Sequence, residues 1–187
     1  MRTAMVPSRA RTRHPSESMA GTTPDDDARY LVIDGRRWRR SDPAIPEALR
    51  TELVAELMDA RRAVGSARRA HDAEAEARAR ARVAHAKLAL GERGTPWWEE
   101  PTEAARRARA VAVAHTLLRH RGPDKTICPS DIARVLSGTG FRAHLALVRD
   151  VVAELADARG LEVRQKGKVV DARAARGPIR IAAVREP

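Results

Sequence analysis

The residues of this 187-residue chain whose types and spacing suggest chemistry are basic and gather near the C-terminus. Between residues 160 and 185, seven Lys and Arg residues stand against two acids, which gives this short stretch a net charge of +5. Two of the bases, Lys166 and Lys168, flank Gly167, where a backbone can approach a partner closely. Clustered bases of this kind neutralise phosphates, so the pattern indicates contact with a polyanion. The alternative interpretation is a solvated basic loop.

The charge of the whole chain points to the same region. There are 36 Lys+Arg residues against 25 Asp+Glu residues, a formal net charge of +11. Residues 101–187 carry +8 of this excess, residues 29–100 carry +3, and residues 1–28 are neutral. A polyanion is therefore expected to approach the C-terminal half. The candidate nucleic-acid-binding residues are Arg142, Arg149, Arg164, Lys166, Lys168, Arg173, Arg176 and Arg180.

The other reactive side chains form no recognisable catalytic or metal-binding motif. The single Cys128 precedes a predicted helix start, where thiolates can be reactive, but no His/Asn motif accompanies it, and a small buried residue at a helix start is the alternative. The six histidines show no HxxxH or HExxH spacing, and no glycine-rich nucleotide loop or G-x-S-x-G motif occurs. We therefore predict a non-enzymatic protein with no cofactor and no metal site.

The elements that must position the basic residues follow a polar N-terminal stretch. Residues 1–28 mix Pro, Ser, Thr, Arg and Asp without an apolar period, which predicts a disordered tail. This stretch lacks the apolar segment of a secretory signal, and no apolar run in the chain approaches the roughly 18 residues of a membrane span. We expect a cytoplasmic protein with no membrane partner. Translation could also start at Met19, so whether residues 1–18 are translated stays open.

Residues 29–100 predict a β-hairpin followed by a helical hairpin. Two short runs flank Asp34-Gly35, a pair typical of the tight turn that needs positive φ at both central residues. Pro46 suits the first turn of a helix, Gly65-Ser66 weakens the helical pattern, and Gly91 is a stop signal. Because each helical stretch has a narrow apolar face, we expect two antiparallel helices rather than one long helix.

Two adjacent tryptophans, Trp97 and Trp98, lie in a proline-rich stretch that ends at Pro101. One interpretation is that at least one indole covers the open end of the helical hairpin, since Trp supplies much of the large apolar area available here. The other is a docking surface for a protein partner or a homodimer. Pro101 marks the predicted boundary between residues 29–100 and a second domain at 102–184.

Residues 102–184 predict three helices followed by a basic β-ribbon. The first helix is capped by Thr102, the second starts near Pro129, and the third spans 141–158 with a core stripe from Phe141 to Leu155. After Gly160 the apolar period becomes alternating, Lys166-Gly167-Lys168 is a turn candidate, and residues 178–181 form the returning strand.

This order of elements predicts a winged helix-turn-helix domain. The third helix can lie in the major groove of B-DNA, about 12 Å wide, while the ribbon, or wing, contacts the backbone. Arg142 and Arg149 are seven residues apart on the face opposite the core stripe, so both could reach a groove. The scarcity of aromatic residues in this half argues against single-stranded nucleic acid, which is bound largely by base stacking.

Several motifs in this half also resemble a known family. Ile-Cys-Pro-Ser-Asp-Ile-Ala-Arg-Val-Leu (127–136), Gln-Lys-Gly-Lys (165–168) and Arg-Gly-Pro-Ile-Arg (176–180) are similar to small bacterial winged-helix domains catalogued as domain of unknown function 3253, over residues 104–182. Residues 29–99, including Gly-Glu-Arg-Gly-Thr-Pro-Trp-Trp-Glu (91–99), resemble actinobacterial chains that sometimes carry a Tol-type transport label. The resemblance implies the fold but no characterised activity.

Taken together, the sequence predicts a mainly α protein with small β elements: an N-terminal β-hairpin plus helical hairpin and a C-terminal winged helix-turn-helix. The expected function is binding of double-stranded DNA through the basic wing and the third helix, which fits a transcriptional regulator. The alternative is a protein-interaction adaptor in which the winged helix is structural.

Overall fold

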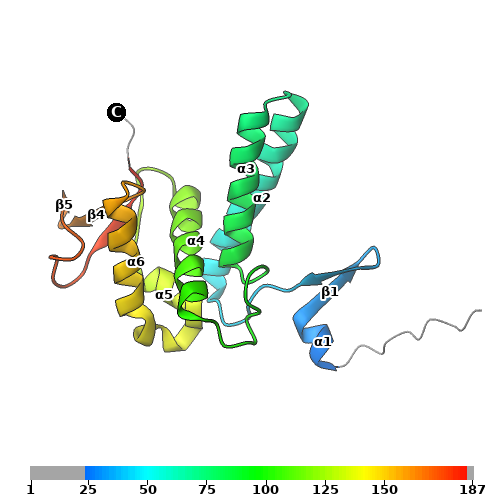
Figure 1. The fold of residues 1–187 in the computed structure, drawn as a ribbon, viewed down its shortest axis with the longest axis horizontal. Helices are drawn as coiled ribbons and strands as arrows, with labels where there is room; N and C mark the ends of the chain where they lie inside the picture. The colour runs from blue at the N-terminus through cyan, green and yellow to red at the C-terminus, as the bar shows by residue number, and fades with distance from the viewer. Residues whose placement is uncertain (1–23, 185–187) are drawn as a thin grey trace, which may run out of the picture.

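The computed structural model of the chain describes residues 24–184. It is mainly helical with two small antiparallel sheets, which confirms the predicted mixture of α and small β elements. Figure 1 shows α4 near the middle of the molecule, with α5, α6 and the C-terminal sheet on one side and the α2–α3 pair on the other. The β1–β2 hairpin extends from the end of the molecule opposite the C-terminal sheet (Figure 1).

The N-terminal elements are a short helix and the predicted β-hairpin. Helix α1 (Pro24–Arg29) leads directly into β1 (Tyr30–Ile33), which pairs with β2 (Arg36–Arg39). Asp34 and Gly35 have φ values of +51° and +71°, as the two-residue turn requires, so the hairpin prediction is confirmed. The expectation of disorder up to residue 28 is wrong for residues 24–28, where α1 continues into the hairpin; residues 1–23 lie outside the described residues.

Two long helices, α2 (Glu47–Arg69) and α3 (Ala73–Ala89), form the predicted antiparallel hairpin (Figure 1). The break falls at residues 70–72 rather than at Gly65-Ser66, which lie inside α2. The reason is local, because His71 takes a positive φ of +53° and Asp72 Oδ1 accepts the Ala75 N–H at 2.8 Å to cap α3. One glycine alone costs a helix only about 1 kcal/mol.

Helix α4 (Glu103–Arg121) joins the two halves of the chain. It packs on α2 and α3 on one side and on α5 and α6 on the other. Thr102 Oγ1 accepts the Ala105 N–H at 3.2 Å, which confirms the predicted N-cap. Buried residues from both sides of Pro101, among them Leu53, Leu90 and Val113, form one hydrophobic cluster. The core is therefore continuous across the predicted boundary.

The C-terminal half contains β3 (Thr126–Ile127), α5 (Pro129–Ser137) and a 3₁₀ segment η1 (Gly138–His144), followed by α6 (Leu145–Asp157). The start of α5 at Pro129 is confirmed. The third helix, predicted from Phe141, begins as an α-helix only at Leu145. Gly138 has a φ of +53°, which ends α5 abruptly, and the next residues close tightly in 3₁₀ turns before the α-helix is established.

The last strands are β4 (Glu162–Gln165), β5 (Lys168–Val169) and β6 (Arg180–Ala182). They form a sheet with β3 in the order β3-β6-β4-β5, and all neighbouring pairs are antiparallel. The returning strand therefore begins two residues later than predicted and lies inside the sheet. Buried Ile127, Val163 and Ile181 attach the sheet to the core.

Candidate nucleic-acid interface

The predicted basic turn lies at the tip of the β4–β5 hairpin. Lys166 and Gly167 have φ values of +50° and +81°, and Gln165 pairs with Lys168 across the two-residue turn. The side chains of Lys166 and Lys168 are exposed. Within residues 24–184 neither lysine forms an ion pair, so both ammonium groups are available to a partner.

A second chain segment lies against this turn. The side-chain amide of Gln165 donates to the carbonyl oxygen of Arg176 at 2.6 Å and to that of Pro178 at 3.1 Å. Arg176 is exposed and has no ion pair in the described part of the chain. Lys166, Lys168 and Arg176 therefore gather on two adjoining segments, and we call these three residues the wing-tip cluster.

Arg149 attaches the same segment to α6. Its guanidinium donates to the carbonyl oxygens of Ala175 at 2.6 Å and of Gly177 at 3.2 Å. The Arg149 guanidinium is therefore engaged within the protein, and its contact with a groove stays a prediction. Its hydrogen bonds instead place the segment that carries Arg176 beside the first turns of α6.

Three further predicted residues are already engaged within the protein. Arg164 pairs with Glu162 at 2.7 Å, and Arg173 pairs with Asp157 at the end of α6. The Asp157 carboxylate raises the pKa of the Arg173 guanidinium. Arg180 is exposed and donates from Nε to Thr126 Oγ1 at 3.1 Å. The sequence could not show these pairings because the partners of Arg173 and Arg180 come from other elements.

Arg142 lies in η1 rather than on α6, together with a basic residue that the sequence prediction missed. The Arg142 guanidinium lies 5.7 Å from the centroid of the Phe141 ring, and that of Arg134, on α5, lies 4.8 Å from the same centroid. Both arginines are exposed and form no ion pair with any described acid. We call Arg134 and Arg142 the Phe141 pair. The available signal was the position of Arg134 between the core residues Ala133 and Val135, which places it on the outer face of α5.

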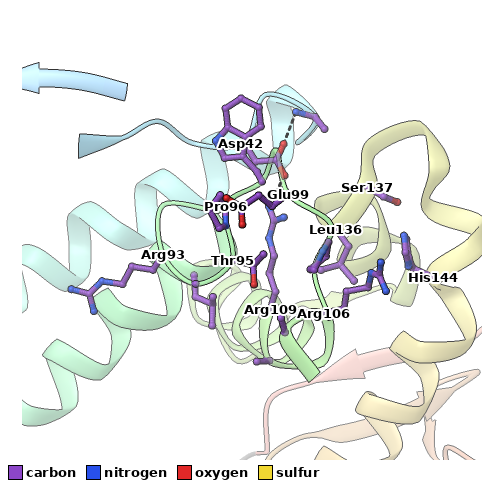
Figure 2. A pocket seen from close by; sticks show the side chains of 17 residues that line it. Asp42, Arg93, Thr95, Pro96, Glu99, Arg106, Arg109, Leu136, Ser137 and His144 are labelled. Atoms are coloured by element: carbon purple, nitrogen blue, oxygen red, sulfur yellow. Dashed lines mark hydrogen bonds and ion pairs between the residues drawn. The ribbon is translucent and has the colours of Figure 1, made fainter. Parts of the chain in front are cut away.

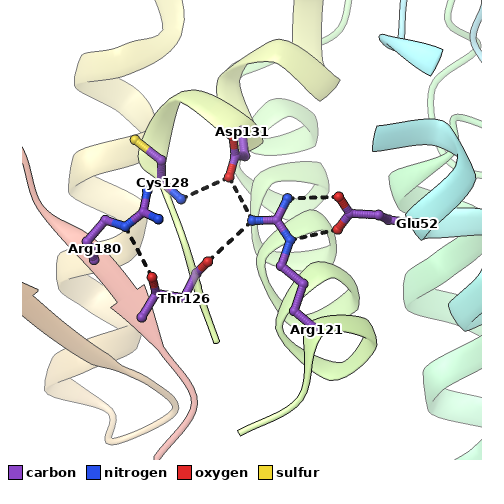
Figure 3. Close-up of polar contacts among 6 residues, drawn as sticks. All are labelled: Glu52, Arg121, Thr126, Cys128, Asp131 and Arg180. Atoms are coloured by element: carbon purple, nitrogen blue, oxygen red, sulfur yellow. Dashed lines mark hydrogen bonds and ion pairs between the residues drawn. The ribbon is translucent and has the colours of Figure 1, made fainter. Parts of the chain in front are cut away.

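A partly buried hydrogen-bond network centred on Arg121 joins α4 to its neighbouring elements (Figure 3). Arg121 donates to both carboxylate oxygens of Glu52 on α2, at 2.7 and 3.0 Å, and to Asp131 on α5 at 3.0 Å. It also reaches the carbonyl oxygen of Thr126 on β3 at 3.3 Å. The bond with Glu52 is the main reason that the pKa of Arg121 is raised. One guanidinium therefore joins α4 to α2, α5 and β3.

Cys128 lies in the same network, just before α5. Its backbone N–H donates to Asp131 Oδ2 at 3.0 Å, and its side chain is half-buried (Figure 3). Cys128 therefore stands at the helix start, as the interpretation of a small buried residue there requires, although its side chain is half-buried rather than buried. Among residues 24–184, no group of three His, Cys, Asp or Glu side chains is placed to hold a metal ion. None of the described helices is long and apolar enough to span a membrane.

The two tryptophans lie at the other side of the molecule. Trp97 donates from Nε1 to the carbonyl oxygen of Arg40 at 3.1 Å and lies beside Gly91, just beyond the end of α3. This position fits the interpretation of an indole at the open end of the helical hairpin. Trp98 contacts Tyr30 edge to face, with ring centroids 5.5 Å apart. Docking of a partner on this segment stays a prediction.

Comparison with known proteins identifies only the C-terminal half. A search of curated proteins found no match. Residues 107–184 match the model of a family described as "Protein of unknown function (DUF3253)". The match agrees with the resemblance over residues 104–182 and contains α5, α6, the wing-tip cluster and the Phe141 pair. The chain is therefore similar to the DUF3253 family of unknown function over residues 107–184.

Proposed function

We propose that the protein binds double-stranded DNA in the cytoplasm through the C-terminal sheet and the start of α6, without catalytic activity, as a transcriptional regulator does. The order of elements supports this proposal: α4, β3, α5 and α6 are followed by β4 and β6, with β6 between β3 and β4. This is the arrangement expected of a winged helix, in which the β4–β5 hairpin is the wing.

One observation carries the proposal: cations without an internal partner gather beside the start of α6. Gln165 holds the Arg176 segment against the turn with Lys166 and Lys168, and Arg149 holds the same segment against α6. A duplex that placed its groove along α6 would bring its backbone to the wing-tip cluster, where each neutralised phosphate releases counterions.

Two of the three acids of α6 are paired with cations of the protein itself. Glu154 pairs with Arg107 of α4, and Asp157 pairs with Arg173, so both carboxylates have cationic partners. The remaining acid, Asp150, lies one residue after Arg149. The net field near the start of α6 is therefore set mainly by the wing-tip cluster and the Phe141 pair.

Double-stranded rather than single-stranded nucleic acid is the preferred partner. Phe141 is the single aromatic residue among Phe, Trp and Tyr in residues 101–187. The guanidinium groups of Arg134 and Arg142 lie over its ring, so the ring is already in contact with side chains of the protein. Stacking of bases on aromatic rings, which dominates single-strand recognition, has no platform here.

The test is fluorescence anisotropy with a labelled 25-base-pair duplex of mixed sequence and with one of its single strands, each measured from 50 to 200 mM salt. We expect the duplex to bind more tightly and its affinity to fall as salt rises. Absence of duplex binding at 50 mM salt, or affinity independent of salt, would refute the proposal.

A second candidate function, a protein-interaction adaptor, is favoured by the β1–β2 hairpin. Leu31, Val32 and Ile33 are 40%, 65% and 53% exposed, although all three are large apolar residues. Such a run on a two-stranded hairpin is typical of an association surface, and here we propose a second copy of the chain as its partner. Sedimentation should show a dimer that Val32→Asp dissociates; a monomer at all concentrations would exclude this function.

A further inference from the structure

A cavity of about 480 Å³ lies at the other end of α4, away from the wing. It is enclosed by residues 93–101, by the N-terminal half of α4 and by the end of α5 (Figure 2). The volume falls within the range of about 300–1,000 Å³ that is typical of sites for small molecules. No part of the proposed DNA-binding function uses it.

The walls of this cavity are held in place by internal hydrogen bonds. Asp42, which is 5% exposed, accepts from Arg109 Nη2 at 2.9 Å and from the Ala44 N–H at 2.9 Å. Arg109 Nε also donates to the carbonyl oxygen of Ala89 at 3.2 Å. The bond from Trp97 to Arg40 fixes the indole beside Asp42 and Arg109, next to Gly91. A ligand would therefore enter a preformed site and would order few additional groups.

The lining has an apolar part and a polar end. The apolar part contains Leu88, Pro96, Trp97, Ala105 and Leu136. The indole and proline rings there offer flat surfaces to an aromatic or alicyclic body.

The polar end is formed by Arg106 of α4 with Ser137 and His144. Ser137 Oγ is the single buried side-chain nitrogen or oxygen within residues 24–184 that has no hydrogen-bond partner. This oxygen is fully buried beside Gly140, so a ligand in the cavity does not contact it. Arg106 is 26% exposed and pairs with Glu100, whose side chain is 85% exposed and can be displaced easily.

The charges around the cavity favour an anion with a single negative charge. Burial and the nearby Arg106 charge lower the pKa of His144, so its imidazole is neutral at neutral pH and can donate one hydrogen bond. The carboxylates of Asp42 and Glu99 also line the cavity, which disfavours a phosphate dianion. Asp42 is already paired with the guanidinium of Arg109, which reduces its attraction for a ligand amine.

We propose that this cavity binds a small carboxylic acid with an aromatic or alicyclic body. The ligand carboxylate replaces Glu100 on the guanidinium of Arg106, where two parallel N–H bonds can form, and His144 donates a further hydrogen bond. The body lies against Trp97, Pro96 and Leu136. The proposal is independent of DNA binding, because the cavity and the wing-tip cluster share no residue.

The experiment is isothermal titration calorimetry of the full chain with 2-naphthoate, 2-naphthamide and acetate. We expect 2-naphthoate to bind with a Kd of about 1 mM or lower, and the amide and acetate to bind at least tenfold more weakly, because each lacks one of the two recognised parts. Equal affinity for the acid and the amide, or no binding of 2-naphthoate at 5 mM, would overturn the proposal.

Matched variants locate the binding. Arg106→Gln should weaken 2-naphthoate at least tenfold, whereas Arg107→Gln, whose side chain pairs with Glu103 and Glu154 outside the cavity, should leave the Kd unchanged. Ser137→Ala removes a buried hydroxyl that has no partner, so it should leave the Kd for 2-naphthoate unchanged while thermal unfolding stays at or above that of the wild type. Equal loss in the Arg106 and Arg107 variants would contradict the assignment.

Discussion

The replacement of both Lys166 and Lys168 by Ala tests the proposed interface most directly. The wing-tip cluster and the Phe141 pair together supply five exposed cations that have no ion pair in the described part of the chain. If each meets one phosphate, the logarithm of the binding constant falls with the logarithm of salt concentration at a slope of about −4.5. The double variant retains three of these cations, so its slope should be about −2.7.

These slopes translate into affinities that an anisotropy titration resolves. Between 50 and 200 mM salt, the wild-type protein should lose about 500-fold in affinity for a duplex, and the double variant about 40-fold. Because phosphate contacts carry no sequence information, the loss at fixed salt should be similar for duplexes of different sequence.

The control removes two positive charges elsewhere. Arg61 and Arg69 on α2 are exposed and, like the lysines, have no ion pair with a described residue. Replacing both by Ala changes the net charge equally but should leave the slope near −4.5. If the control flattens the slope as much as the lysine variant does, binding depends on net charge alone and the proposed interface is wrong.

Three further predictions concern stability. Arg121→Met strands the partly buried carboxylates of Glu52 and Asp131, so urea unfolding should show a loss of about 2–3 kcal/mol, somewhat less than for a fully buried pair. Gly138→Ala should cost about 2 kcal/mol or more in the same assay, because φ is +53° and the added Cβ would lie 2.6 Å from the Ala44 carbonyl oxygen. The third concerns His115. Burial lowers the pKa of its imidazole below the ordinary value of 6.5, so the folded state binds fewer protons than the unfolded chain. Stability should therefore fall as pH drops below about 6.5, and it should fall less in the His115→Gln variant.

Each of these has a matched comparison. Arg78→Met breaks an exposed pair with Glu74 and should change stability by no more than about 0.5 kcal/mol. Gly35→Ala shares the positive φ but meets no atom within 4 Å, so its cost should be about 1 kcal/mol. His85, stacked on His115 at 5.5 Å, also has a pKa lowered by burial, so His85→Gln should likewise reduce the pH dependence. Equal stability changes in the two arginine variants, or in the two glycine variants, would contradict the reasoning for that pair. If neither histidine variant alters the pH dependence of stability, the reasoning on His115 is wrong.

Features that depend on neighbours in the chain were predictable from the sequence. The turn at Asp34-Gly35, the N-cap at Thr102 and the helix start at Pro129 each depend on a few adjacent residues, and each is confirmed. The same holds for the turn at Lys166-Gly167. The break between α2 and α3 was misplaced because two competing local signals, Gly65 and Asp72, lie only seven residues apart, and a long packed helix tolerates the glycine.

The composition and order of residues alone determined a mainly helical protein whose basic side chains concentrate near residues 160–185. Only the tertiary structure decided which of those side chains are free. Arg173 pairs with Asp157, 16 residues earlier in the chain, and Arg180 donates to Thr126, 54 residues earlier. A charge pattern along a sequence gives the number of cations, but the partner of each cation depends on which distant element the packing of the core brings within hydrogen-bonding distance.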